Sequence, residues 1–239
     1  MTLATNISSP RLVARFTGLS YLIVIVGGVV AQGVISNRLV VFSSAGTTAT
    51  NILANRQLFQ LGFTIFLIEM AAQVAMTGLF YILLRPVSKS LALLSAFWGL
   101  TASVMKTFAR VFYIVPLFVL GGTTALSGFS TEQLQSLALV LLRVNIQGAN
   151  LAVAFFGLEV ALRGYLVMRS TFLPRWFGLL SLISGLGWLT FFYPSLGSRL
   201  FVILALMALF AAAAQIVWLF VSGVDEKRWK EQAGVSSQI

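Results

Sequence analysis

Six apolar stretches, each long enough to cross a lipid bilayer, constrain this chain more than any other feature of its sequence. A helix needs about 20 predominantly apolar residues to cross the hydrocarbon core of a membrane. Because lipid offers no hydrogen bonds, each stretch must satisfy its own backbone polar groups, which a helix does. The sequence therefore predicts an all-α integral membrane bundle of six helices, organised as a single transmembrane domain over residues 1–239. The predicted spans are 12–36, 57–84, 90–120, 132–162, 176–194 and 199–223.

The composition argues against a soluble domain and against several kinds of functional site. Only 9% of the residues are charged and the mean hydropathy is +0.96, whereas a soluble domain carries about 25% charged residues. The chain has no Cys and no His, the residues that most often bind zinc or act as nucleophile and base. We therefore expect no metal, no cofactor and no catalytic residue. The composition indicates a non-enzymatic protein whose first partner is the lipid bilayer.

The positive charge of the chain indicates membrane orientation, and it predicts no nucleic-acid partner. The formal net charge is +10, but the basic residues flank the apolar stretches and form no single block. An excess of Lys and Arg in the loops marks the cytoplasmic side. We therefore predict a multi-pass protein of the cell (inner) membrane with both termini in the cytoplasm and a short, charged, mobile tail at 224–239. With this orientation the cytoplasmic residues are Arg11, Arg15, Arg85, Lys89, Arg163, Arg169, Arg175, Lys227, Arg228 and Lys230, and the outer ones are Arg38, Arg56 and Arg199.

Local signals predict two helix starts and several helix contacts. Ser44 is placed to cap a short interfacial helix within the outer loop 37–56. Ser130 and Gln133 form a capping box that starts the fourth membrane helix. Small residues let helices approach closely in lipid, and the predicted packing faces carry Ala71 with Ala75, Gly148 with Ala152, Gly157 with Gly164, Gly178 with Gly185, and Ala205 with Ala208 and Ala212.

Five charged residues, Glu159 and four others, interrupt stretches that should lie within the hydrocarbon core. With a rise of about 1.5 Å per residue, Glu69, Lys106, Arg110 and Arg143 fall at a similar depth, in the outer half of the membrane. Charged groups at such depth normally face the interior of the bundle or a wet cavity. The agreement among three helices predicts a single polar cluster between them.

Polar residues at helical spacing extend this cluster. Residues four or seven positions apart share one face of a helix, and each of the three helices carries such a stripe. One carboxylate against three cations gives the cluster a formal charge of +2. The predicted ligand-binding residues are Glu69, Gln73, Lys106, Arg110, Arg143, Gln147 and Asn150.

The cluster has a structural and a functional interpretation. In the structural one, Glu69 pairs with Lys106 or Arg110, and Arg143 extends to the outer headgroups; the chain is then a structural or regulatory subunit whose charges serve helix packing, a membrane-protein partner or a second copy. In the functional one, the excess positive charge binds a carboxylate, a phosphate or a lipid headgroup in a site open outward. The protein then binds or transports a small anionic or amphipathic molecule. An enzyme built on Glu69 and Lys106 is a third interpretation, and whether loop 37–56 covers the cluster stays open.

Several short motifs follow one another in a fixed order along the chain. They are Thr48–Ala54 followed by Leu58–Gly62, Leu83–Ser88 leading into Leu91–Leu94, Phe155–Leu158, and Gly164–Gly178. These motifs resemble those of a bacterial membrane family catalogued as domain of unknown function 4386, and the resemblance extends over nearly the whole chain. It implies a multi-pass membrane protein without an established activity.

The chain departs from this family pattern in its fourth membrane helix. The resemblance implies an acidic residue at the position of Glu69 and histidines near Asn145 and Glu159, but this chain has no His. A metal-linked or proton-linked role that depends on these histidines in the family is therefore not expected in this chain. From spacing alone, Glu159 lies four residues before Arg163, which predicts a local ion pair near the inner interface.

Overall fold

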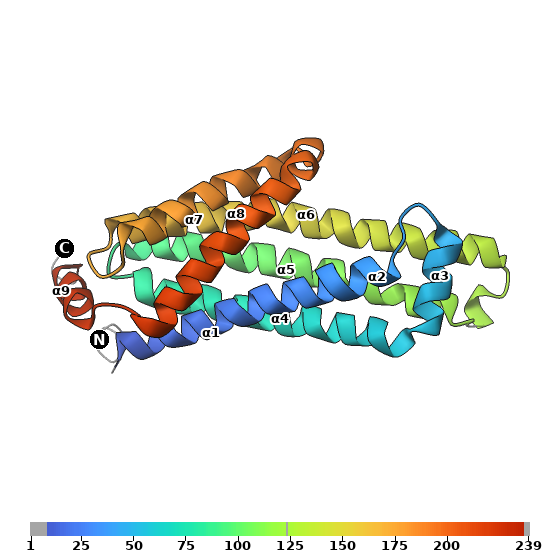
Figure 1. Cartoon of the computed structure of the whole chain (residues 1–239), viewed down its shortest axis with the longest axis horizontal. Helices are drawn as coiled ribbons and strands as arrows, with labels where there is room; N and C mark the ends of the chain where they lie inside the picture. Colours follow the sequence, from blue (N-terminus) through green and yellow to red (C-terminus); the bar gives the residue numbers. More distant parts are fainter. Residues whose placement is uncertain (1–8, 123, 237–239) are drawn as a thin grey trace. The chain divides into compact units, whose positions relative to one another are not determined.

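The computed structural model describes residues 9–122 and 124–236, and all regular structure within these two ranges is helical (Figure 1). Helix α1 is continued by a π-helix, η2, and by one short helical turn, α2. Two short 3-10 segments, η3 and η4, precede α6 and follow α7. The elements are α1 Pro10–Gly28, η2 Val29–Ser36, α2 Asn37–Leu39, α3 Ala45–Ala54, α4 Arg56–Leu84, α5 Lys89–Leu120, η3 Thr124–Leu126, α6 Thr131–Arg169, α7 Arg175–Trp188, η4 Leu189–Phe192, α8 Pro194–Val221 and α9 Glu226–Ser236.

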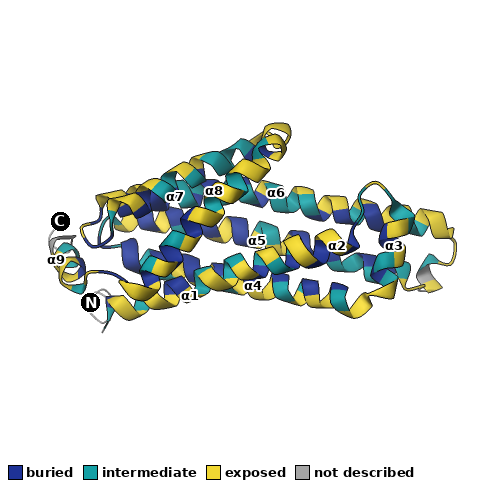
Figure 2. Cartoon of the chain, viewed as in Figure 1, coloured by how far each residue is buried: buried dark blue, intermediate teal, exposed yellow. Residues whose placement is uncertain are grey.

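Six helical segments in the described chain are long and apolar enough to cross a membrane, which confirms the predicted all-α, six-span fold class. Large apolar side chains are exposed along these segments. Figure 2 shows exposed residues in yellow along the length of α1 and of α8. On α8, Phe210 is 70% and Val221 is 75% exposed. So much exposed apolar surface fits lipid and not water, which indicates a multi-pass membrane protein. The spans are Pro10–Leu39, Arg56–Leu84, Lys89–Leu120, Thr131–Arg169, Arg175–Phe192 and Pro194–Val221.

Two span boundaries differ from the prediction by five residues or more. Helix α6 continues to Arg169, beyond the predicted end at residue 162, so Arg163 is inside a helix and not in a cytoplasmic loop. Helix α8 begins at Pro194, five residues before the predicted start, because proline is favoured in the first turn of a helix, where its missing N–H is not needed.

The two predicted helix caps are confirmed. The Ser44 hydroxyl accepts a hydrogen bond from the Thr47 N–H at 3.2 Å and begins α3. At the start of α6, the Ser130 hydroxyl accepts from the Gln133 N–H at 3.3 Å, and the Gln133 side chain accepts from the Ser130 N–H at 2.8 Å. This reciprocal pair satisfies two N–H groups that the first turn of a helix leaves open.

Contacts within the described chain divide it into two compact units, each with its own apolar core. Unit 1 contains residues up to Ile23, Ala72–Ser103 and the chain from Leu151 onward; unit 2 contains Val24–Ala71 and Val104–Asn150. The core of unit 1 includes Phe80, Leu83, Leu166, Phe177 and Leu219. The core of unit 2 includes Ile35, Ile52, Phe59, Phe66, Tyr113 and Leu142.

Helices α6 and α7 of unit 1 pack with their backbones in contact, along the glycines that the sequence singled out. A methyl group added at Gly164 would lie 2.5 Å from the Leu182 nitrogen and 2.7 Å from the Gly178 oxygen. One added at Gly157 would lie 2.9 Å from the Gly185 oxygen. Since real side chains do not approach backbone atoms so closely, only glycine fits at these positions, as expected of helix packing in lipid.

The prediction of a mobile tail is wrong for residues 226–236, which form helix α9. Trp229 on this helix is 3% exposed, and its indole N–H donates to the Leu83 oxygen at 2.9 Å. At the first turn of α9, Glu226 accepts from the Ser9 hydroxyl at 3.0 Å and from the Arg11 N–H at 3.3 Å. The described chain therefore begins and ends at the same end of unit 1.

The Glu226 contacts predict an acid-sensitive attachment of α9. Hydrogen bonds from Ser9 and from the Arg11 N–H hold the pKa of the Glu226 carboxyl below its usual range. A carboxyl with a lowered folded-state pKa stabilises the attachment above its ordinary pKa, and this contribution is lost as the pH falls through the lowered value. We expect amide hydrogens of α9 to lose protection from exchange below about pH 4. Glu226→Gln should lose that protection at neutral pH and show no further acid step.

Candidate functional site

A buried ion pair joins two membrane helices of unit 2. Glu69 on α4 accepts a hydrogen bond from the Lys106 ammonium on α5. The Glu69 side chain is 3% exposed and that of Lys106 is 17% exposed. The structure thus brings together the predicted carboxylate and one of its two predicted partners, and Lys106 is the member that can be reached from outside.

Arg110 adds a second buried cation, one helical turn after Lys106. It is 3% exposed, and one terminal nitrogen donates to the Asn145 side-chain oxygen on α6 at 2.9 Å. Its guanidinium carbon lies 3.6 Å from the centre of the Phe66 ring, a cation–π contact. Glu69 pairs with Lys106, and among the described residues no acid forms an ion pair with Arg110.

The polar stripe predicted on α6 does not join this cluster. Arg143 and Gln147 are exposed, and Asn150 is half-buried. The Arg143 guanidinium donates to the Phe42 oxygen at 3.0 Å, in the connection before α3. The structure leaves a cluster of one carboxylate and two cations, with a formal charge of +1 where the prediction had +2.

Asn145 is the site residue that sequence reasoning missed. It is 2% exposed and lies on the buried face of α6 that also carries Leu142 and Ala152. Asn145 follows Leu142 by three positions and precedes Ala152 by seven, and both spacings match the helical repeat. Starting the periodicity from the apolar residues, and not from Arg143, would have placed Asn145 inside.

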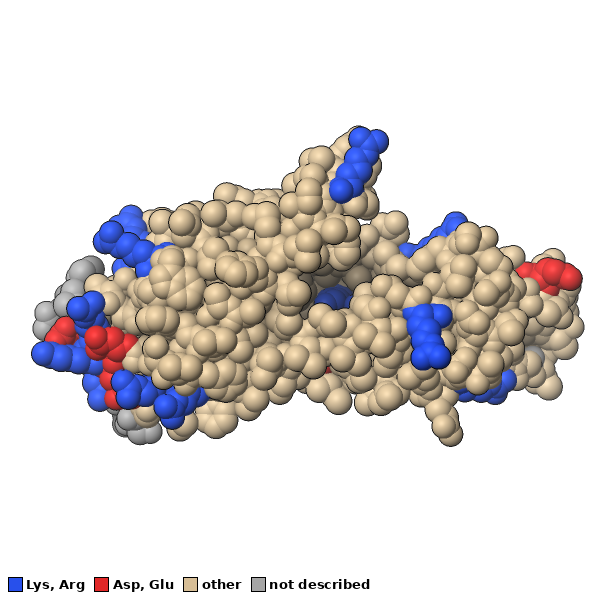
Figure 3. Space-filling view, viewed as in Figure 1, with Lys and Arg blue, Asp and Glu red and all other residues tan. Residues whose placement is uncertain are grey.

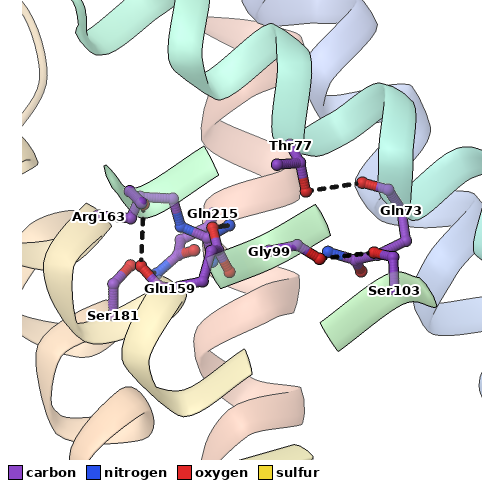
Figure 4. A network of polar contacts seen from close by, with 9 residues as sticks. Gln73, Thr77, Gly99, Ser103, Glu159, Arg163, Ser181 and Gln215 are labelled. Carbon is purple, nitrogen blue, oxygen red and sulfur yellow. Dashed lines mark hydrogen bonds and ion pairs between the residues drawn. The ribbon is translucent and has the colours of Figure 1, made fainter. Parts of the chain in front are cut away.

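Gln73 is buried as predicted, but it belongs to unit 1. Its backbone oxygen accepts a hydrogen bond from the Thr77 hydroxyl at 2.9 Å, within the same helix (Figure 4). The contacts described for the Glu69 cluster all lie in unit 2.

The first membrane segment approaches the ion pair through two glycines. A methyl group added at Gly27 would lie 3.3 Å from the Glu69 Cβ, and one at Gly28 would lie 3.5 Å from a Glu69 carboxylate oxygen. The π-helix η2 begins at the next residue, Val29. Such π-helical stretches are rare and are often found at functional sites. No local pattern in the sequence predicted this one.

A layer of stacked aromatic rings packs against Arg110. Phe66, which carries the guanidinium, lies edge-on to Tyr113, with ring centres 5.2 Å apart. Tyr113 in turn stacks on Phe59 at 4.3 Å. All three rings are fully buried, in the same core as Ile52 of α3. Aromatic side chains therefore pack against one side of the Arg110 guanidinium, and the partly exposed Lys106 is the more accessible cation.

Two polar atoms of the cluster are buried without a hydrogen-bond partner in the described chain. They are one carboxylate oxygen of Glu69 and the Nε of Arg110. Buried polar atoms are nearly always bonded in native proteins, so such atoms require an explanation. An anionic group placed against Arg110 would accept from this free N–H.

The second buried ion pair lies in unit 1 and confirms the predicted pairing of Glu159 with Arg163 (Figure 4). The two side chains are 3.0 Å apart and 3% and 2% exposed, so the pair is buried inside the protein. Arg163 also lies over the Phe80 ring at 4.3 Å. One carboxylate and one guanidinium balance here, which leaves no excess charge for a ligand.

The acidic residues of the described chain form no group that could hold a metal ion: within residues 9–122 and 124–236, no three Asp or Glu side chains gather.

Comparisons with known proteins identify relatives but no activity. Residues 16–223 match the family described as "Domain of unknown function (DUF4386)". An uncharacterized protein of Archaeoglobus fulgidus is 28% identical over 127 residues, which are 53% of this chain and 60% of that protein. The chain thus spans less than two thirds of the length of the curated relative it matches. No solved structure shows a significant match to the chain.

Proposed function

Because this chain belongs to the family described as "Domain of unknown function (DUF4386)", whose description assigns no activity, we propose a function from the geometry of its charged cluster. The protein is a non-enzymatic, multi-pass protein of the bacterial cell (inner) membrane. It binds or transports a small anionic, amphipathic molecule at Lys106 and Arg110, with Glu69 as the resident counter-ion.

The observation that supports this proposal is the unbalanced positive charge of the cluster. Glu69 pairs with Lys106, whereas Arg110 is 3% exposed and forms no ion pair among the described residues. A buried charge without a partner of opposite sign is costly in an apolar surrounding. A carboxylate or phosphate would remove this imbalance, and the guanidinium can hold it through charge-assisted hydrogen bonds. The unpartnered Nε of Arg110 is one donor for such a group.

The surroundings of Lys106 favour an amphipathic ligand over a small inorganic ion. Lys106 belongs to a membrane-spanning helix of predominantly apolar residues, and its side chain is 17% exposed. A molecule that reaches this ammonium from within the bilayer needs an apolar portion. Its anionic head would then contact the Lys106 ammonium first, since that side chain is the partly exposed one.

The proposed orientation rests on the distribution of basic residues. Figure 3 shows Lys and Arg gathered at the end of unit 1 that carries α9 and the first turn of α1. Since such an excess marks the cytoplasmic side, this end of unit 1 is assigned to the cytoplasm.

The proposal is tested by thermal unfolding of the detergent-purified protein against long-chain carboxylates, alkyl phosphates and anionic phospholipids. Arg110→Gln removes a buried cation, and Arg143→Gln removes an exposed one from the same unit. We expect a ligand that stabilises the wild type and Arg143→Gln, by about 2.7 kcal/mol at one hundred times its Kd, but leaves Arg110→Gln unchanged. Equal stabilisation of all three proteins, or of none, would contradict the proposal.

The contacts of the cluster also favour one alternative, a structural or regulatory subunit. The pair of Glu69 with Lys106 ties α4 to α5, and the bond of Arg110 to Asn145 ties α5 to α6. Such contacts can specify helix pairing, or the excess charge can pair with an acidic helix of a partner or of a second copy. The alternative is supported if no anion stabilises the protein and if charge reversal at Arg110 abolishes co-purification with another membrane protein.

A further inference from the structure

A hollow at the α9 end of unit 1 combines basic side chains with interfacial aromatic and hydroxyl groups. Its volume is about 650 Å³. It is bordered by the first turn of α1, the connection between α6 and α7, the end of α8 and the start of α9. The residues that line it include Arg11, Thr171, Phe172, Trp218, Ser222, Lys227 and Arg228.

The chain turn at the end of α8 places Arg11 at this hollow. Gly223 has a φ of +64°, a conformation that favours glycine, and it redirects the chain from α8 into α9. A methyl group added there would lie 3.0 Å from the Cγ of Arg11. The stem of Arg11 therefore rests on Gly223, and its guanidinium borders the hollow from the side of α1.

The acidic residues that border the hollow are occupied by contacts within the protein. Glu226 accepts from the Ser9 hydroxyl and the Arg11 N–H. Asp225 accepts from the Arg228 N–H at 3.1 Å and pairs with its guanidinium at 3.5 Å. Lys227 forms no ion pair within the described chain. Lys227 and Arg11 are thus the cations best placed to face an additional anion.

The hollow lies where membrane spans begin and end. Helix α1 begins at Pro10, α7 begins at Arg175 and α8 ends at Val221. Trp218 on its wall contacts Trp176 edge-on, with ring centres 5.7 Å apart. Paired tryptophans at span ends are typical of the headgroup layer of a bilayer. Trp218 lines the hollow, and its buried indole N–H has no hydrogen-bond partner in the described chain.

We propose that this hollow binds the headgroup of an anionic phospholipid. The phosphodiester would lie between Arg11 and Lys227, and a glycerol ester oxygen would accept from Trp218, while the acyl chains follow the exposed apolar side of α8. Basic clusters directly next to a membrane span bind anionic lipids in this manner. The site is separate from Lys106 and Arg110, so it does not depend on the function proposed for them.

The test is calorimetric titration of the detergent-purified full chain with short-chain phosphatidylglycerol, short-chain phosphatidylcholine and glycerol 3-phosphate. Arg11→Gln combined with Lys227→Gln should weaken phosphatidylglycerol binding about 25-fold, at about fivefold for each cation removed. Arg15→Gln combined with Lys230→Gln removes the same charge at the same end but outside the hollow, and should change binding less than about twofold. Arg11→Lys combined with Lys227→Arg keeps both charges and should recover the binding.

Three outcomes would overturn the proposal. Equal weakening by the two double variants would show general surface attraction and no defined site. Equal binding of phosphatidylcholine would show that the negative charge of the headgroup is not recognised. Binding of glycerol 3-phosphate as tight as that of the lipid would identify a site for soluble phosphate esters. Thermal unfolding of each variant without lipid verifies that the fold is kept, so a loss of binding is attributable to the hollow.

Discussion

Replacing Gly164 with valine is expected to lower the free energy of unfolding by about 3 kcal/mol or more, because α6 and α7 touch through their backbones at this residue. The first added carbon alone would meet the Leu182 nitrogen at 2.5 Å. A backbone cannot rotate away as a side chain can, so the two helices must separate. Separation also removes the close contact at Gly178, whose own added carbon would lie 2.7 Å from the Gly164 oxygen.

A matched control exists in α4. Gly78 is also within a membrane helix, but a methyl group added there would meet nothing within 4 Å. Gly78→Val should therefore leave stability unchanged or raise it by a few tenths of a kcal/mol through helix propensity. Unfolding in mixed micelles with increasing denaturing detergent measures both variants. Similar losses for Gly164→Val and Gly78→Val would mean that the α6–α7 contact is looser than described.

The six spans were predictable because the length of an apolar stretch is a local property. The two span boundaries that differ most from the prediction each depend on a local feature of the chain. Pro194 starts α8 early, and the ion pair of Arg163 with Glu159 keeps α6 helical where a basic residue suggested a loop. The charge of Arg163 was counted for the cytoplasmic side, although the side chain is 1% exposed. A basic residue marks a loop only when no acid one turn away satisfies it.

The polar cluster was predicted in part, because charge alone does not decide which face of a helix is buried. Glu69, Lys106 and Arg110 are close together as expected. Arg143 is exposed and donates a hydrogen bond to the Phe42 oxygen. The residue of α6 that contacts Arg110 is Asn145. The choice depends on the packing of Leu142 against the aromatic core of unit 2, which is tertiary information.

Two further features lay beyond sequence reasoning for different reasons. The π-helix η2 begins directly after Gly28, whose approach to Glu69 is a contact that only the folded chain defines. Helix α9 is polar and charged, a composition that predicts a mobile tail. The helix is nevertheless attached to the rest of unit 1 through one side chain. Trp229 is buried, and its indole N–H donates a hydrogen bond to the Leu83 oxygen.

Glu69→Gln is expected to cost about 3–5 kcal/mol of unfolding free energy, because it leaves Lys106 and Arg110 as uncompensated buried cations. Lys106→Met should cost much less. It leaves one carboxylate and one cation, and Glu69 still attracts the Arg110 charge. The double variant Glu69→Gln with Lys106→Met returns to a single excess charge and should recover most of the lost stability. Equal costs for the two single variants would show that Arg110 does not share the Glu69 carboxylate.

The same variant separates the two interpretations of the cluster. If an anion binds at Lys106 and Arg110, Glu69 competes with it for the cations, so Glu69→Gln should bind that anion more tightly than the wild type and regain stability in its presence. The measurement is the unfolding midpoint of Glu69→Gln across the same carboxylates, alkyl phosphates and lipids, with Glu69→Gln/Arg110→Gln as control. A purely structural cluster would leave Glu69→Gln unstable in every anion, since a closed aromatic core around Arg110 admits no substitute for the missing carboxylate.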